Sequence, residues 1–206
     1  GLTAADLRLL GTLGSVLPAL ETLILIERLG SADPDGLQRL AEGLSAGALP
    51  AVTRLRISCM PLGDAGASAV AAALGQGALP RLKVLYLHNA AIGNAGLVAL
   101  APALRRRPAL ESLYFVGNPL GDEGLAALVA PPPAGALPPP TGVLTKLKQL
   151  YLDHTQITDA SCATLAAALN SGTLPALERV SVGGTPASAA AKAAVHEALA
   201  VANRSE

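Results

Sequence analysis

Three tyrosines, Tyr86, Tyr114 and Tyr151, are the residues of this 206-residue chain whose type and spacing most favour a binding function. Each holds the fifth position of a six-residue segment of the form LxxLxL, where L is an apolar residue, and the chain has no other tyrosine. Tyrosine is enriched at protein interfaces because its ring buries apolar area while its hydroxyl makes hydrogen bonds. We predict a ladder of rings on adjacent strands, about 4.8 Å apart. Stacking that only stabilises the strands is the structural alternative.

The other candidate site residues fall at the third, fifth, seventh or eighth positions of such segments. Arg54 and Arg56 place a basic patch beside the first tyrosine, and two histidines and an aspartate are expected past the ladder, toward the strand ends. Arginine beside tyrosine is typical of an interface core. Gly117 is expected to leave room for a partner's side chain. The predicted partner-binding residues are Arg54, Arg56, Tyr86, His88, Tyr114, Tyr151, Asp153 and His154.

Catalytic and metal-binding chemistry find less support in the residues. The chain has no HExxH, GxSxG, P-loop or CxxC motif. Cys59 and His88 could form a thiol–imidazole pair, but an open sheet offers no pocket that excludes water. His88 lies two repeats from Asp153 and His154, roughly 10 Å away, which is too far for shared metal ligation. We therefore predict a protein that is not an enzyme and that carries no metal or cofactor.

The elements that must position these residues come from an internal repeat. Six segments of the LxxLxL form start 28 to 37 residues apart, a period typical of a solenoid. Because side chains alternate along a strand, positions one, four and six should enter the core, and positions three, five and seven should face outward. The six predicted strand segments are Leu20–Leu25, Val52–Ile57, Leu82–Leu87, Leu110–Phe115, Leu147–Leu152 and Leu177–Val182.

A turn and an alanine-rich helix follow most of the strand segments. Asp64, Asn94, Asp122 and Asp159 stand in these turns, where Asp and Asn are favoured helix N-caps. The second-position residues alternate in charge between neighbouring strands, which indicates a compensating ladder. These second-position residues are Lys83, Glu111, Lys148 and Glu178.

The fourth repeat carries the sequence signature of a known family. Residues 110–120 match the pattern LxxLxLxxNxL with Asn118 at the conserved polar position. The chain thus resembles the leucine-rich repeat proteins, and its LGDAG, IGNAG and LGDEG turns resemble the ribonuclease-inhibitor-like subclass. The resemblance implies an α/β horseshoe of about six repeats, with a parallel sheet on the concave side and helices on the convex side. In place of the asparagine, the other repeats have Arg28, Met60, Ala90, Thr155 and Thr185, of which the threonine hydroxyls should substitute in part.

The repeats predict one domain over residues 1–206. Residues 1–16 are interpreted as an N-terminal half repeat or cap, residues 17–182 as the repeats, and residues 183–206 as a C-terminal capping helix. A proline-rich insertion at 130–143 lengthens the fourth unit. It is either a semi-rigid spacer or a ligand for a groove that recognises polyproline helices.

Composition and charge narrow the classes of function. Hydrophobic residues make up 51% of the chain, which excludes bulk disorder. The net charge of zero argues against nucleic-acid binding, and no apolar run is long enough for a transmembrane segment. Two cysteines do not make a disulfide scaffold. We expect an intracellular protein, or an organellar one if a presequence was removed before Gly1.

These observations favour a non-catalytic module that binds a protein partner on its concave face. Two alternatives stay open. The chain could be a structural subunit permanently docked in a larger multiprotein assembly, organellar or membrane-associated. It could also be the sensor or autoinhibitory repeat segment of a larger receptor.

Overall fold

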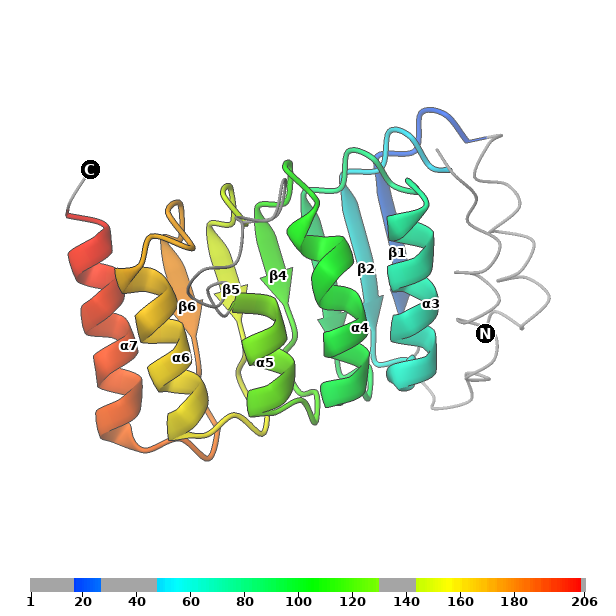
Figure 1. Cartoon of the computed structure of the whole chain (residues 1–206). Helices are drawn as coiled ribbons and strands as arrows, with labels where there is room; N and C mark the ends of the chain where they lie inside the picture. The colour runs from blue at the N-terminus through cyan, green and yellow to red at the C-terminus, as the bar shows by residue number, and fades with distance from the viewer. Residues whose placement is uncertain (1–16, 27–47, 130–143, 205–206) are drawn as a thin grey trace.

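A computed structural model describes residues 17–26, 48–129 and 144–204. Within them, six parallel strands form one sheet in chain order, so each strand pairs with the strand of the next repeat (Figure 1). The pairing is in register throughout, with the apolar fourth positions Leu55, Leu85 and Leu113 side by side. The strands are β1 (Thr22–Ile26), β2 (Arg54–Ser58), β3 (Val84–His88), β4 (Ser112–Tyr114), β5 (Gln149–Tyr151) and β6 (Arg179–Ser181).

The helices of the described part all lie on one side of this sheet and leave its other side uncovered (Figure 1). Their sequences are rich in alanine, which combines high helix propensity with a small side chain that allows close packing. None of them is both long and apolar enough to cross a membrane. The helices are α3 (Gly63–Gly75), α4 (Asn94–Arg105), α5 (Asp122–Val129), α6 (Asp159–Asn170) and α7 (Ala189–Ala202).

The core lies between the sheet and the helices. In the third repeat, the first, fourth and sixth positions, Leu82, Leu85 and Leu87, are at most 1% exposed, as the strand alternation predicts. Leu97 and Leu100 of α4 pack in the same core and are fully buried. The repeat fold predicted from the sequence, an α/β leucine-rich repeat solenoid, is therefore confirmed.

The turn after β4 contains Asn118, the asparagine of the family pattern, and shows what this residue contributes. The Asn118 Oδ1 accepts hydrogen bonds from the backbone N–H groups of Ala90 and Ile92 in the preceding repeat. Its Nδ2 donates to the carbonyl groups of Leu87 and Phe115. Asn118 therefore joins two repeats through groups that are all buried.

The threonines at this position replace only part of that network. Thr155 Oγ1 donates to the Leu152 carbonyl at 2.7 Å, and Thr185 Oγ1 donates to the Val182 carbonyl at 2.8 Å. Both bonds stay within one repeat. The expectation that threonine substitutes in part is therefore met: each threonine makes one such hydrogen bond, whereas the Asn118 side chain makes five.

The prediction of helix N-caps from the turn residues is wrong in detail. Asp64, Asn94, Asp122 and Asp159 lie inside the first turn of their own helices, and the N-cap positions of α3 and α4 carry no side-chain cap. Each of the four side chains instead accepts hydrogen bonds at the start of the helix in the next repeat. The acceptors therefore cap helices, as Asp and Asn do elsewhere, but across the boundary between repeats.

The opposite ends of the helices are also joined by a side chain. Arg107, just after α4, donates from its guanidinium group to the carbonyls of Leu74, Ala78 and Leu79 at the end of α3 and in the turn that follows. A cation suits this place because the carbonyl end of a helix carries partial negative charge. Burial lowers the pKa of Arg107, yet three carbonyl partners hold the charged group in place.

Some of the predictions concern residues outside the described ranges. They include the half repeat or cap at 1–16, Arg28, and the proline-rich insertion at 130–143. The division of the chain into cap, repeats and capping helix stays a prediction.

Candidate partner-binding face

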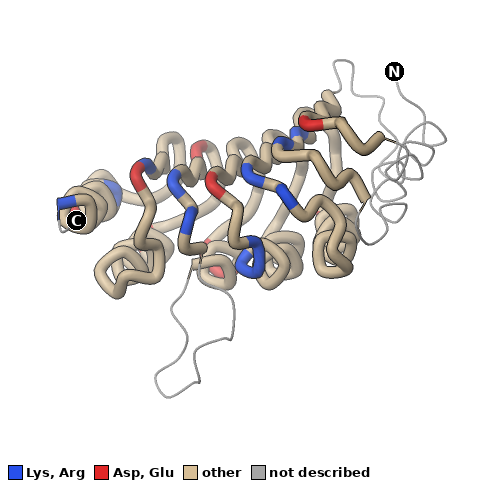
Figure 2. The backbone as a smooth tube through the Cα atoms, turned by 90° about the horizontal axis from the view of Figure 1, so that it is seen from above, with Lys and Arg blue, Asp and Glu red and all other residues tan. Residues whose placement is uncertain are grey.

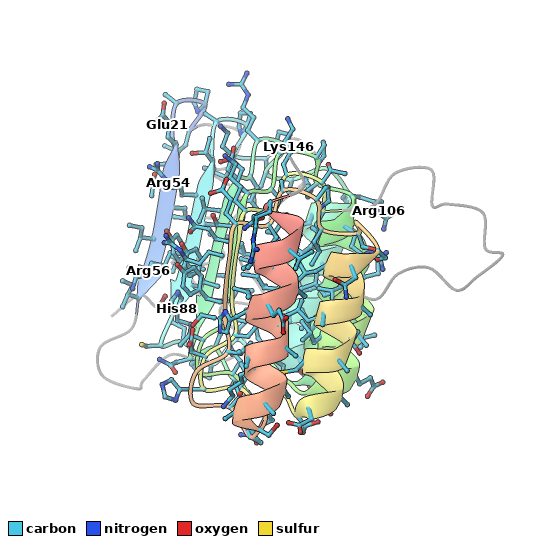
Figure 3. The ribbon with its side chains drawn as sticks, turned by 90° about the vertical axis from the view of Figure 1, so that its left-hand side faces the viewer. Glu21, Arg54, Arg56, His88, Arg106 and Lys146 are labelled. Carbon is cyan, nitrogen blue, oxygen red and sulfur yellow. The ribbon has the colours of Figure 1, made fainter. Side chains whose placement is uncertain are left out.

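We define the open face as the side of the sheet that the helices do not cover. Arg54 and Arg56 on β2 and His88 on β3 point from this face, away from the helices, whereas Arg106 lies on the far side (Figure 3). The two arginines are exposed and His88 is half-buried. Strand alternation places them there, because their neighbours Leu55 and Leu87 fill the core.

The three tyrosines form a continuous stack across the middle of the open face. The strand register aligns Tyr86 with Tyr114 and Tyr114 with Tyr151. The ring centroids are 4.3 Å apart for the first pair and 4.6 Å apart for the second, with interplanar angles of 21° and 7°. We call Tyr86, Tyr114 and Tyr151 the tyrosine ladder; each of its side chains is half-buried.

The orientation of the rings decides what the tyrosine ladder offers to a ligand. The ring spacings nearly equal the distance of about 4.8 Å between strands, so the ring faces cover one another along the row. The open face therefore presents ring edges and hydroxyl groups. Ring edges carry positive partial charge, which suits carbonyl and carboxylate oxygens. The Tyr114 hydroxyl donates to Gln149 Oε1 at 2.7 Å, and burial first, with Tyr86 and Tyr151 adding to it, raises the Tyr114 pKa.

His88 extends the aromatic stack instead of lying past it. Its ring is 5.7 Å from the rings of both Tyr86 and Tyr114 and is nearly parallel to them. Burial, with a further contribution from the Arg56 charge, lowers the His88 pKa, so the imidazole is neutral near neutral pH. Its Nε2 is buried without a hydrogen-bond partner among the described residues. The expected position beyond the tyrosine ladder is thus corrected, because the flat ring gains more by stacking.

Arginines stand at both ends of the tyrosine ladder. On β2, the guanidinium carbon of Arg56 lies 5.9 Å from the Tyr86 ring centroid, and its Nε donates to Ser58 Oγ. Beyond the last ring, the Tyr151 side chain lies beside the Arg179 guanidinium of β6 and raises the pKa of Arg179. The ring's electrons stabilise the Arg56 guanidinium, whereas a hydrogen bond with the Tyr151 side chain is the main cause of the raised Arg179 pKa.

Arg179 and Gln149 were not among the residues predicted for the site. Both occupy the third position of their segments, on the same face as the tyrosine ladder. The alternation rule could have included them. The contacts with Tyr151 and Tyr114 could not be read from the sequence, because they depend on how long side chains lean between neighbouring strands.

Asp153 and His154 lie near the strand ends and take no part in the aromatic stack. Asp153 Oδ1 accepts hydrogen bonds from Ser181 Oγ at 2.5 Å and from the Gly183 N–H at 2.9 Å. His154 is exposed in the following turn with a positive φ of 55°, and its ring fills the space over Gly184. The carboxylate of Asp153 is therefore already occupied by its own chain.

The space expected beside Gly117 is filled. A Cβ at Gly117 would lie 1.9 Å from Asn89 Oδ1, so the Asn89 side chain covers this glycine. The φ of 71° at Gly117 is left-handed, but Asn89 and His154 adopt a similar conformation at the equivalent positions, so the covering Asn89 side chain is what leaves no space for a Cβ here. Gly117 thus leaves no room there for a partner's side chain.

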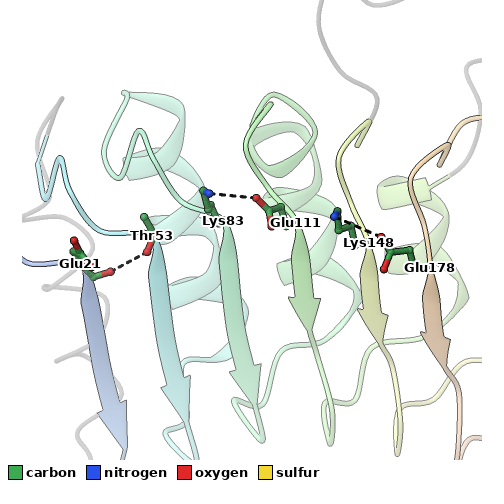
Figure 4. A network of polar contacts seen from close by, with 6 residues as sticks. All are labelled: Glu21, Thr53, Lys83, Glu111, Lys148 and Glu178. Carbon is green, nitrogen blue, oxygen red and sulfur yellow. Dashed lines mark hydrogen bonds and ion pairs between the residues drawn. The ribbon is translucent and has the colours of Figure 1, made fainter.

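The charged residues at the second positions of the segments form two separate ion pairs, just before the strands begin. Lys83 Nζ is 3.4 Å from Glu111 Oε1, and Lys148 Nζ is 3.5 Å from Glu178 Oε1 (Figure 4). Acidic and basic residues are interspersed along this edge of the molecule (Figure 2). These exposed pairs contribute little to stability, but they neutralise four charges beside the open face.

The thiol of Cys59 and the imidazole of His88 do not form a pair in the structure. Cys59 is exposed, and its Sγ lies 4.0 Å from Asn89 Nδ2. In the described ranges, no group of three or more histidine, cysteine, aspartate or glutamate side chains could hold a metal ion.

Comparisons with known proteins agree with this architecture. Residues 108–129 match the family model described as Leucine Rich repeat. The structure is similar to that of Leiomodin-1 Actin-Binding Site 2, with 12% identity, a TM-score of 0.54, and coverage of 100% of this chain and 92% of that chain. It is also similar to the tropomodulin C-terminal domain of Caenorhabditis elegans, with 15% identity, a TM-score of 0.50, and coverage of 98% and 93%. No curated protein sequence gives a significant match.

The chain has a leucine-rich repeat fold, and one segment of it, residues 108–129, matches the family model. The matched segment contains Asn118, whose side chain carries the hydrogen bonds of the family turn. Assignment to the ribonuclease-inhibitor-like subclass stays a prediction from the turn sequences.

Proposed function

We propose that the chain is a non-catalytic module that binds a protein partner on its open face, centred on the tyrosine ladder. One observation carries the proposal: all three tyrosines of the chain stack in one row on the side of the sheet that the helices leave uncovered. A row of this kind is where an interface would gain most from burial, since tyrosine is among the residues that dominate binding energy.

The side chains of the tyrosine ladder are already held in place, which reduces the entropy lost when a partner binds. Side chains that must be immobilised at an interface reduce affinity by about 0.5–1.5 kcal/mol each. Here the stacking of Tyr86, Tyr114, Tyr151 and His88 has already fixed the rings, and Arg56 is held by Ser58. A partner would therefore meet a preformed surface.

The similar structures support the general class of function. The leiomodin-1 structure is named as an actin-binding site, so a chain with this fold serves there to bind a protein. At 12% identity the likeness carries no residue and no particular partner over to this chain.

Affinity capture with matched variants tests the proposal. The baits are the wild-type chain, the variant Tyr86→Ala/Tyr114→Ala/Tyr151→Ala, and the control Val98→Ala/His196→Ala, which changes exposed residues on α4 and α7. All three are first compared by circular dichroism and urea unfolding. We expect the wild type and the control to retain a protein that the tyrosine variant loses. Retention of the same proteins by all three baits would contradict binding at the tyrosine ladder.

A further inference from the structure

The arginines of the open face form no ion pair with a carboxylate in the described part of the chain, although the Glu178 charge acts on Arg179 from a greater distance. Arg54, Arg56 and Arg179 are exposed and make no ion pair there. Of the nearby acidic groups, Glu111 and Glu178 pair with lysines, and Asp153 accepts from Ser181 and Gly183. The exposed Glu21, beside Arg54, is one carboxylate against three arginines. The open face is therefore locally positive in a chain whose formal net charge is zero.

Part of the negative charge lies away from the tyrosine ladder, at the starts of the helices. The carboxylates Asp64, Asp122 and Asp159 cap the starts of α4, α6 and α7, below the ends of the strands. Charge is thus separated between the helix starts and the row that holds the tyrosine ladder. Such separation steers an acidic ligand toward the row.

The positive charge sits at two places with the tyrosine ladder between them. Arg54 and Arg56 stand on β2, and Arg179 stands on β6, four strands further along the sheet. At about 4.8 Å per strand, the two places are about 19 Å apart. Between them lie ring edges and hydroxyls, which favour oxygen acceptors and tolerate apolar contact.

The backbone of the sheet limits how a ligand can lie there. The N–H and carbonyl groups of the inner strands β2 to β5 are already paired with neighbouring strands, so a segment that crosses the face must bind there through side-chain contacts. An extended or polyproline segment advances about 3.1–3.3 Å per residue, and it covers 19 Å in about six residues.

From these distances and charges we infer that the open face binds an extended acidic segment that crosses the strands. Two carboxylates about six positions apart meet Arg54 and Arg56 at one end and Arg179 at the other, and the apolar residues between them lie on the tyrosine ladder. The inference rests on the proposed function and adds to it the chemistry and spacing of the partner segment.

Selection from a displayed library of random peptides tests the inference on the full chain. The library is selected in parallel on the wild type, on Tyr86→Ala/Tyr114→Ala/Tyr151→Ala, on Arg179→Gln, and on the control Arg204→Gln at the end of α7. We expect peptides enriched on the wild type and the control to carry two acidic residues five to seven positions apart. These peptides should be lost from the tyrosine variant and weakened about tenfold on Arg179→Gln.

Synthetic peptides then measure the spacing directly. The probe has two glutamates separated by five alanine, proline and leucine residues, and its controls have glutamine in place of glutamate or only two residues between the glutamates. We expect both controls to bind at least about tenfold more weakly in a fluorescence anisotropy titration. Equal affinity for the three peptides would overturn the inference.

The outcomes separate this inference from the proposed function. Peptides that need the tyrosines but lack paired acidic residues would overturn the inference and leave the tyrosine ladder as a binding site. If no enriched peptide depends on the tyrosines, the inference fails, and the capture experiment decides the proposed function independently.

Discussion

The Oδ1 atom of Asp64, in the first turn of α3, accepts a hydrogen bond at 3.0 Å from the backbone N–H of Gly96, in the first turn of α4. The same oxygen accepts from the Gly93 N–H at 2.7 Å. A Cβ at Gly96 would lie 2.5 Å from this oxygen, so the glycine is what lets the two helix starts approach. Asn94 repeats the arrangement with Gly121 and Gly124 of the following repeat. The glycines of the IGNAG and LGDEG turns therefore belong to contacts between repeats.

Substitution of these glycines should reverse the usual effect of helix propensity. Alanine is favoured over glycine inside a helix by about 1 kcal/mol. We nevertheless expect Gly96→Ala to destabilise the protein by about 1–3 kcal/mol, because the new Cβ meets Asp64 and Ile92 closer than 3 Å. The matched control is Gly75→Ala at the end of α3, where nothing lies within 4 Å and stability should hold or rise. Urea unfolding measures both, and stabilisation by Gly96→Ala would contradict the contact between repeats.

The capping carboxylates should make stability depend on acidity. Although burial acts to raise it, hydrogen bonds from Ser161 and Thr158 lower the pKa of Asp122, and the backbone and hydroxyl of Ser188 lower the pKa of Asp159. Because each folded pKa lies below the unfolded value of about 3.9, this stabilisation is present above about pH 4 and is lost as pH falls through the folded pKa.

Thermal unfolding between neutral pH and about pH 2 measures that loss. The variant Asp122→Asn/Asp159→Asn keeps two side-chain acceptors but removes two titrating groups. We expect its melting temperature to change less with acidity than that of the wild type. The control Glu123→Gln removes an exposed carboxylate of α5 and should follow the wild type. Identical acid profiles for all three proteins would show that the caps contribute no linked stability.

Asn118 should be the most sensitive polar residue of the turns. Its replacement by alanine leaves the buried N–H groups of Ala90 and Ile92 without their acceptor, and we expect a loss of about 3 kcal/mol. Asn118→Thr should lose less, because a hydroxyl can make the single bond that Thr155 makes. Denaturant unfolding ranks the two variants, and equal stability of Asn118→Ala and the wild type would rule out this role.

The pKa of the His88 imidazole should depend on the charge of the neighbouring Arg56. Burial first, and the Arg56 charge second, lower the folded pKa of His88 below its ordinary value of about 6.5. The linked stability is therefore present above about pH 6.5 and is lost as pH falls through the folded pKa. An NMR titration of the imidazole protons should show the pKa of His88 rising in Arg56→Gln and staying unchanged in Arg204→Gln. No difference between these two variants would exclude the influence of Arg56.

The strands and the composition of the open face could be predicted from the sequence, because a strict period of two and a repeat near 30 residues leave one consistent arrangement. The tyrosine ladder followed from the register alone. The partners of the turn residues could not be predicted. Local sequence placed Asp64 at the start of its own helix, whereas its contacts are set by the next repeat.

Side-chain direction caused the remaining differences at the site. His88 leans back over Tyr86 and Tyr114, Asn89 folds over Gly117, and Arg179 meets Tyr151. The contacts of His88 and Arg179 join residues at different positions of the repeat, which columns drawn from the sequence keep apart. Asn89 and Gly117 share the eighth position, and there the sequence does not show the direction of the Asn89 side chain.

The central claim is that the tyrosine ladder is the surface that contacts a partner. Because the chain has three tyrosines and all lie in the tyrosine ladder, 3-fluorotyrosine labels this surface alone. The measurement is a fluorine NMR titration of the labelled chain with the captured, unlabelled partner. We predict that the resonances of Tyr86, Tyr114 and Tyr151 change chemical shift together and saturate at one partner concentration. Unchanged chemical shifts in a sample that size-exclusion chromatography shows to be complexed would contradict the claim.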